Sequence, residues 1–408
     1  MSKRQQLPPQ IRKTEIKDRR TAKEVTRYQL TVDVAPDPET GKRRQIRRRF
    51  TTEKAARDEL AKVQGGVTAG TYVHSSRLTV DQACEAWLQS KHSLKQSTLA
   101  GHRSKLQALR DTLGHIEVQK LSKTDLDTLV GQLRRGEVDG HKKWTPRSVN
   151  YLLYLTTAML DDQVKQGNVV RNVARLVDRI AGDPQKFRTL TEKEMFAVLD
   201  HDCRDRHVWT LALYGLRRGE IAGLRWCNVN LTEKPVGEGE EALPPKHLRV
   251  SENRINIGKT IVTGTPKSKA SRRILPLPDE VVDVLKTARK RQLEERLAFG
   301  EGYGPGEHVA CDETGHPYHP NLIYWRWGKM LDGLKIDRVR LHDARHTCGT
   351  LMHLRGVPIA VIAAWLGHAS AAFTLTVYAH SQDDALKAAG SSFSRVVTSG
   401  DTETGSSG

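Results

Sequence analysis

The residues best suited to chemistry lie in one stretch of the C-terminal half, which holds His342 and Arg345, then His368, then Tyr378. On a helix, His342 and Arg345 are i,i+3 neighbours, so an imidazole and a guanidinium can reach the same anionic group. The segment Leu366-Gly367-His368 is typical of a helix that ends at glycine. A phosphate held between these segments would meet hydrogen-bond donors, a proton acceptor and a nucleophilic phenol.

Upstream, the turn Gly215-Leu216-Arg217-Arg218-Gly219-Glu220 supplies a second arginine and a carboxylate. Together with His342, Arg345, Leu366-Gly367-His368 and Tyr378, it resembles the tyrosine recombinase (phage integrase) family. The resemblance covers about residues 78 to 390. It implies a mainly α fold with small β elements, and a site-specific DNA recombinase of a phage or mobile element that works through a 3′-phosphotyrosyl intermediate.

The resemblance also implies a role for each residue. Tyr378 would be the nucleophile, because a phosphotyrosyl ester stores the energy of the broken phosphodiester bond. Arg217 and Arg345 would hold the non-bridging phosphate oxygens, which planar guanidinium groups match with paired hydrogen bonds. His342 would accept the phenol proton, since imidazole titrates near neutrality, and His368 would donate a hydrogen bond to the phosphate.

Two further assignments leave alternatives open. Glu220 either supports the arginine pocket or is an ordinary first-turn acid favoured by the helix dipole. Residues 260 to 277 are typical of two strands around a polar turn, and Lys267, which follows Pro266, is expected to protonate the leaving 5′-oxygen. Lys269 is the alternative, because a slip in the register would exchange the two lysines.

Two competing motifs predict other chemistry. Gly258-Lys259-Thr260 resembles the end of a phosphate-binding loop, but that loop requires glycine at position 253, where Asn253 stands. His342 and His346 have the spacing of a zinc-hydrolase helix, yet Asp343 stands where that motif needs glutamate. We therefore expect neither a metal ion nor another cofactor.

Charge indicates the partner. Lys and Arg number 66 against 48 Asp and Glu, a net charge of +18, and residues 1 to 50 alone hold 15 basic and 6 acidic residues, half of that excess. Such an imbalance predicts a polyanionic partner, here double-stranded DNA. Five scattered cysteines favour a reducing cytoplasm over a disulfide framework. Apolar runs are too short for the ~18 residues of a membrane span, and the N-terminus is too polar for a signal peptide.

Periodicity and turn signals predict four parts. Residues 1–70 form an arm-type DNA-binding domain, with strands at 27–32 and 43–50 and a helix at about 53–64 capped by Thr51 or Thr52. Residues 78–180 form a helical core-binding domain, with helices after Thr79 and at 97–113, 122–133 and 145–166. A linker at 181–188 precedes the catalytic domain, 189–390, which is mostly helical with one β insertion. Residues 391–408 form a flexible tail.

Three alternatives remain at this point: a Xer-like resolvase, a transposon recombinase, or a non-catalytic DNA-binding protein. The basic N-terminal extension favours an integrase. By resemblance, four protomers would assemble on DNA core sites and exchange strands through a Holliday junction, with separate arm sites for the N-terminal domain. A directionality factor and a host DNA-bending protein are possible partners, in the cytoplasm of a prokaryotic host.

Overall fold

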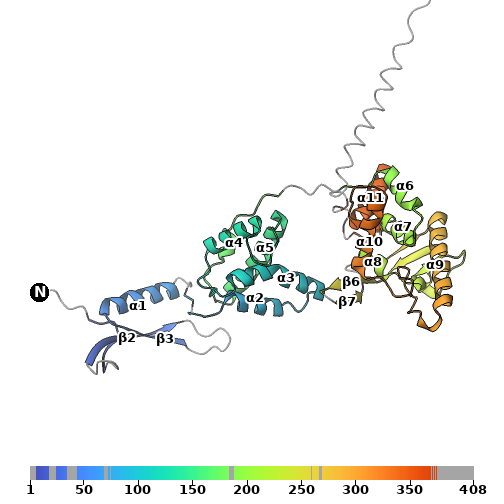
Figure 1. The fold of residues 1–408 in the computed structure, drawn as a ribbon. Helices are drawn as coiled ribbons and strands as arrows, with labels where there is room; N and C mark the ends of the chain where they lie inside the picture. The colour runs from blue at the N-terminus through green and yellow to red at the C-terminus, as the bar shows by residue number, and fades with distance from the viewer. Residues whose placement is uncertain are drawn as a thin grey trace, which may run out of the picture. The chain divides into compact units, whose positions relative to one another are not determined.

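The computed structural model describes residues 6–17, 24–34, 44–68, 72–73, 75–182, 188–258, 260–265, 269–368, 370, 372 and 374. The chain divides into two compact units, Met1–Asp183 and Pro184–Gly408 (Figure 1).

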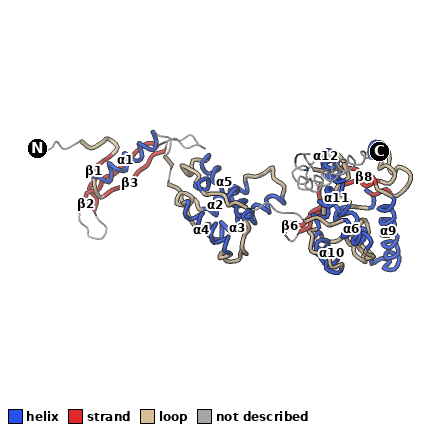
Figure 2. Tube along the Cα trace, turned by 90° about the horizontal axis from the view of Figure 1, so that it is seen from above, coloured by secondary structure: helices blue, strands red, loops and turns tan. Residues whose placement is uncertain are grey.

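The first unit begins with an antiparallel sheet in the order β1 (Ile11–Lys17), β2 (Glu24–Val34) and β3 (Arg44–Phe50). Helix α1 (Glu53–Thr68) lies across one face of this sheet (Figures 1 and 2). The predicted strands and helix are confirmed, but β1 was not predicted. Its sequence IRKTEIK has only two apolar residues among exposed polar ones, so its alternation is too weak to identify it as a strand.

The register of this sheet separates its side chains by face. Because successive side chains in a strand alternate, the buried residues that pack on α1 share one face, and four arginines share the other. The buried residues are Ile11, Leu30, Val32 and Ile46. The arginines are Arg12, Arg27, Arg47 and Arg49, and Arg12 and Arg49 are both paired with Gln29 of the central strand.

A four-helix bundle completes the first unit. It consists of α2 (Val80–Gln89), α3 (Gln96–Leu113), α4 (Lys123–Arg135) and α5 (Pro146–Lys165), with a short 3-10 turn at Val173–Leu176. The side chains of Thr79, Ser122 and Thr145 each accept a hydrogen bond from a first-turn backbone N–H, which stabilises the helix starts. The four predicted helices are thereby confirmed to within one or two residues at most ends.

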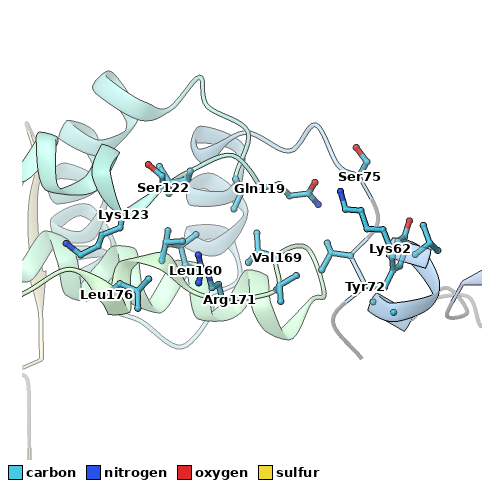
Figure 3. A pocket seen from close by; sticks show the side chains of 18 of the residues that line it. Lys62, Tyr72, Ser75, Gln119, Ser122, Lys123, Leu160, Val169, Arg171 and Leu176 are labelled. Atoms are coloured by element: carbon cyan, nitrogen blue, oxygen red, sulfur yellow. The ribbon is translucent and has the colours of Figure 1, made fainter. Parts of the chain in front are cut away.

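The first unit also contains a cavity of about 720 Å³. Figure 3 shows Lys62 and Tyr72 on one side of it and Leu160, Val169 and Leu176 on the other. None of the residues expected to act on a phosphate lines this cavity.

The second unit is built mainly from helices packed on one apolar core. They are α6 (Glu192–Asp200), α7 (Arg206–Leu213), α8 (Arg218–Gly223), α9 (Asp279–Phe299), α10 (Pro320–Gly333), α11 (Leu341–Leu354) and α12 (Ile359–Leu366). Trp209 and Trp327 meet edge to face at the centre of the core, with ring centroids 5.5 Å apart. Among the described helices of both units, none is long and apolar enough to cross a membrane.

Two small sheets lie beside these helices. One has the order β4 (Val229–Asn230), β5 (His247–Val250) and β8 (Arg273–Pro276), and the other is the hairpin of β6 (Asn253–Ile257) and β7 (Thr260–Gly264). The prediction that residues 260–277 form two strands around one turn was wrong in its pairing, because β7 pairs with β6 and β8 with β5. Leu275 and Leu277 are buried in the main core, which draws β8 away from β7.

Candidate active site

Arg217 is the residue directly before α8. Its guanidinium is hydrogen-bonded to the protein, and part of its side chain remains exposed. Its backbone N–H and its guanidinium both donate to Glu220, at 2.9 Å and 2.7 Å. A second guanidinium nitrogen donates to the carbonyl of Gly367 at 2.8 Å. About a third of the Arg217 side chain, 32%, stays exposed, so the group is oriented by the protein and still accessible from outside.

Glu220 is buried between two arginines. Its carboxylate, 3% exposed, accepts hydrogen bonds from Arg217 and, at 3.1 Å and 3.0 Å, from both terminal nitrogens of Arg273. Burial by itself would raise the pKa of this carboxyl, but the hydrogen bonds and charge of Arg273, with the charge of Arg217, outweigh it and lower the pKa. Glu220 is therefore an anion that fixes two guanidinium groups.

His342 and Arg345 lie on the first turns of α11, as the sequence predicted. Arg345 is 1% exposed and donates to the carbonyl of Gly215 at 2.6 Å and to that of Leu366. The His342 side chain is partly exposed, and its ring lies 5.0 Å from that of His346 in an edge-to-face arrangement. Partial burial, and then the charges of His346 and Arg345, lower the pKa of His342 to about 4. The imidazole is thus neutral near pH 7 and able to accept a proton.

His368 follows the end of α12. This helix ends at Gly367 in the left-handed conformation, and the His368 N–H donates to the carbonyl of Ala363, as a glycine-terminated helix requires. The His368 Nδ1 lies 2.8 Å from the Thr374 hydroxyl. Partial burial and the charges of Arg345 and Arg217 lower the pKa of His368 to about 3. If the hydroxyl donates to Nδ1, the ring proton resides on Nε2, the nitrogen that would donate to a phosphate.

Two glycines allow these segments to approach closely. Gly215 has a φ of +97°, and a Cβ there would lie 2.8 Å from Leu366. Gly367 has a φ of +61°, and a Cβ there would lie 3.0 Å from the carbonyl oxygen of Ala270. Larger residues at either position would separate α12 from the elements that carry the arginines.

The structure therefore brings together Arg217, Glu220, His342, Arg345 and His368 from three separate segments. Such a site can neutralise an anion with two guanidinium groups while a neutral imidazole accepts a proton. Tyr378 and Lys267 lie outside the described residues, and Lys269 begins a 3-10 turn at Lys269–Ser271. Within the described part of the chain, no three His, Cys, Asp or Glu side chains are grouped to hold a metal ion.

Arg273 was missed by the sequence reasoning. Its side chain is 7% exposed and, besides Glu220, it donates to the carbonyl of Trp365 at 2.6 Å. A signal was present: in the alternation of β8, Arg273 occupies the same face as the buried Leu275. An arginine at an inward position of a strand requires a buried acceptor, and Glu220 is that acceptor.

Comparison with known proteins agrees with this geometry. Residues 242–385 match the phage integrase family, and residues 17–66 match an arm DNA-binding domain. A XerC-like tyrosine recombinase of Caldanaerobacter subterraneus subsp. tengcongensis is 24% identical over 86% of this chain and 92% of its own length.

Two solved structures share the fold. The Tn1549 transposon integrase in complex with transposon right end DNA has a TM-score of 0.60 at 18% identity, covering 76% of this chain and 98% of that one. A lambda integrase tetramer bound to a Holliday junction has a TM-score of 0.52 at 14% identity, covering 90% and 97%.

Residues 242–385 form a domain of the tyrosine recombinase (phage integrase) family. The chain is a site-specific recombinase, an enzyme that cleaves and rejoins DNA strands. The expected fold class is confirmed as well: a mainly α protein with small sheets, a sheet-plus-helix arm, a helical domain and a mixed catalytic domain.

Proposed function

We propose that this recombinase is an integrase whose strand cleavage is performed by a single set of side chains: Arg217, Lys267, His342, Arg345, His368 and Tyr378. One observation carries the proposal. Guanidinium groups from α8 and α11 converge on the last carbonyls of α12, immediately before His368. Two cations and a neutral imidazole at one place suit a phosphodiester better than any neutral substrate.

The cleavage step follows from these groups. The phenol oxygen of Tyr378 attacks the phosphorus, the new O–P bond forms as the bond to the 5′-oxygen breaks, and the product is a 3′-phosphotyrosyl ester. His342 accepts the phenol proton, and Lys267, or Lys269 in its place, protonates the 5′-oxygen. Arg217 and Arg345 stabilise the added charge on the non-bridging oxygens, while His368 donates to one of them and Glu220 orients Arg217. The reverse attack by a 5′-hydroxyl rejoins DNA without another energy source.

Covalent trapping tests the nucleophile. A nicked suicide substrate releases the short fragment that carries the free 5′-hydroxyl, so cleaved DNA cannot be rejoined. On this substrate the parent enzyme should accumulate a protein–DNA adduct, and Tyr378→Phe should bind the DNA without forming one. Tyr324→Phe is the matched control, since Tyr324 is an exposed tyrosine of the same unit and should leave adduct formation intact. An undiminished adduct from Tyr378→Phe would assign the nucleophile to another residue.

A sulfur substitution tests the general acid. A bridging 5′-thiolate leaves without protonation, so a substrate that carries it should restore cleavage to Lys267→Ala if Lys267 protonates the ordinary 5′-oxygen. Rescue of Lys269→Ala alone would move the role to Lys269. Absence of rescue for both variants would show that neither lysine acts as the acid.

We assign the remaining parts of the chain to DNA as well. Residues 1–70 would bind arm sites, 78–180 would bind the core site with the catalytic residues 189–390, and 391–408 would form a tail. The match of residues 17–66 to an arm DNA-binding domain supports the first assignment. The likeness to a lambda integrase tetramer on a Holliday junction supports a homotetramer on DNA. A cytoplasmic location, a directionality factor and a host bending protein complete the proposal.

A further inference from the structure

Three arginines donate to three consecutive carbonyls at the end of α12. Arg273 contacts the carbonyl of Trp365, Arg345 that of Leu366 and Arg217 that of Gly367. The last carbonyls of a helix lack donors within the helix and carry its partial negative charge, so cations are stabilised there. The end of α12 is thus held by side chains from β8, α11 and the start of α8.

All three guanidinium nitrogens of Arg273 donate to acceptors within the protein. Its Nε donates to Trp365, one terminal nitrogen donates to Glu220 and to the carbonyl of Ser271, and the other donates to Glu220. Arg273 is therefore placed to orient other groups and not to contact a phosphate.

The partners of Arg273 belong to both halves of the site. Each Glu220 oxygen accepts one hydrogen bond from Arg217 and one from Arg273, so the two guanidinium groups share one carboxylate. Arg273 also lies against Gly367, where an added Cβ would come within 3.1 Å of it. The Arg273 side chain thus connects Glu220, which orients Arg217, with the turn at Gly367, which leads into His368.

We propose that Arg273 is a positioning residue for strand cleavage: through Glu220 it fixes Arg217, and through the Trp365 carbonyl it fixes the end of α12. This inference rests on the proposed function, in which Arg217 acts on the scissile phosphate. Without Arg273, the buried Glu220 keeps one guanidinium partner in place of two, and Arg217 is drawn from its position toward the carboxylate. DNA affinity should be largely unaffected, since many other basic residues contact phosphates.

The test is adduct formation on the suicide substrate, measured in a single turnover with saturating full-length enzyme. Arg273→Met should be slower by about 10- to 100-fold, as for residues that orient a reacting group. Arg273→Lys keeps the charge but loses the paired hydrogen bonds, so it should also be slower by at least about tenfold. The control Arg272→Met removes the same charge from the exposed neighbouring residue and should stay within roughly twofold of the parent.

Double variants separate positioning from a general structural defect. Because one of its two routes passes through Arg217, loss of Arg273 should cost several-fold less in an Arg217→Ala background than in the parent, but the full factor in a His342→Gln background. The unfolding midpoint and DNA affinity are measured alongside. If Arg273→Met folds poorly, the same comparison is made with Arg273→Lys.

Each outcome has one meaning. Parent-like cleavage by Arg273→Lys, or an undiminished loss on adding Arg273→Met to Arg217→Ala, would overturn the positioning role. A normal cleavage rate for Arg217→Ala itself would instead refute the proposed function on which the inference rests.

Discussion

The arginines of the candidate active site and those of the N-terminal sheet are the same residue type in opposite settings. In the site, Arg345 and Arg273 are almost fully buried, and their guanidinium groups are held by carbonyls and by Glu220. On the sheet, Arg47 and Arg49 are exposed on the face opposite α1. The first group is fixed before any DNA arrives, whereas the second keeps its conformational freedom.

This contrast separates two uses of positive charge. A fixed guanidinium stabilises charge that develops at one position, and it does so without reorganisation during the reaction. An exposed arginine attracts any phosphate within the screening distance and releases counterions when it binds. Substitutions in the two regions should therefore change different measurements.

The largest effect is expected at the fixed arginines. Arg217→Ala and Arg345→Ala should each slow adduct formation by roughly 10² to 10³-fold, as for loss of a donor to a developing oxyanion. Affinity for a core site should fall far less, because binding is distributed over many phosphates. Rates come from single-turnover cleavage and affinities from titration. Equal losses of cleavage rate and of DNA affinity would make these residues ordinary DNA-binding arginines, no different in use from those of the N-terminal sheet.

Substitutions of the sheet arginines should have a smaller effect, and it should fall on DNA binding and not on cleavage. Arg47→Ser combined with Arg49→Ser should leave core-site cleavage intact and reduce the slope of log K against log salt on arm DNA by about 2, because each arginine neutralises one phosphate. Arg48→Ser is the control, because Arg48 lies on the α1 side and pairs with Glu59. Should the control change the slope as much as the double variant, the open face would not be the DNA-binding face.

The smallest effect concerns pH. His207 is buried in the catalytic unit, donates toward the Val309 carbonyl through Nε2, and has its pKa lowered from 6.5 to about 4 by burial and by Arg291. The unfolded chain takes up this proton first, so stability is complete above pH 6.5 and is lost as the pH falls toward 4.

For His207 alone this loss amounts to at most about 3 kcal/mol. The measurement is urea unfolding followed by tryptophan fluorescence at pH 7 and pH 5. His207→Gln should reduce the dependence, and the lowered pKa values of His342 and His368 account for a remainder. The sheet of residues 11–50 contains no histidine and should show no corresponding loss by hydrogen exchange. A pH dependence that His207→Gln leaves unchanged would assign the effect to other groups.

The sequence predicted those elements whose signals are local. Capping by Thr79, Ser122 and Thr145 and the glycine at the end of α12 depend on neighbouring residues, so the corresponding helix ends were placed well. The pairing of β8 with β5 depends on burial of Leu275 in a core assembled from distant segments, and was predicted wrongly. Strand pairing is set by tertiary packing more than by the strand sequence itself.

The same distinction applies to the site. The motifs identified Arg217, Glu220, His342, Arg345 and His368, and the structure brings these five together. The motifs did not reveal that Arg217 and Arg345 are anchored on carbonyls of α12, because those hydrogen bonds join residues 150 and 21 positions apart. Arg273 escaped notice for a similar reason, since its partner Glu220 is 53 residues away.

Helix α12 buries Ile362 and Leu366 in a small apolar cluster with residues of α11, and its Trp365 packs against the main core of the catalytic unit. Segments with little buried apolar surface open with less free energy than the rest of a protein. The hydrogen bonds to its last carbonyls therefore add to what holds this helix in place, and Tyr378 follows it in the chain by only twelve residues. The three arginines that hold these carbonyls thus stabilise the position of the helix as well as the geometry of the site.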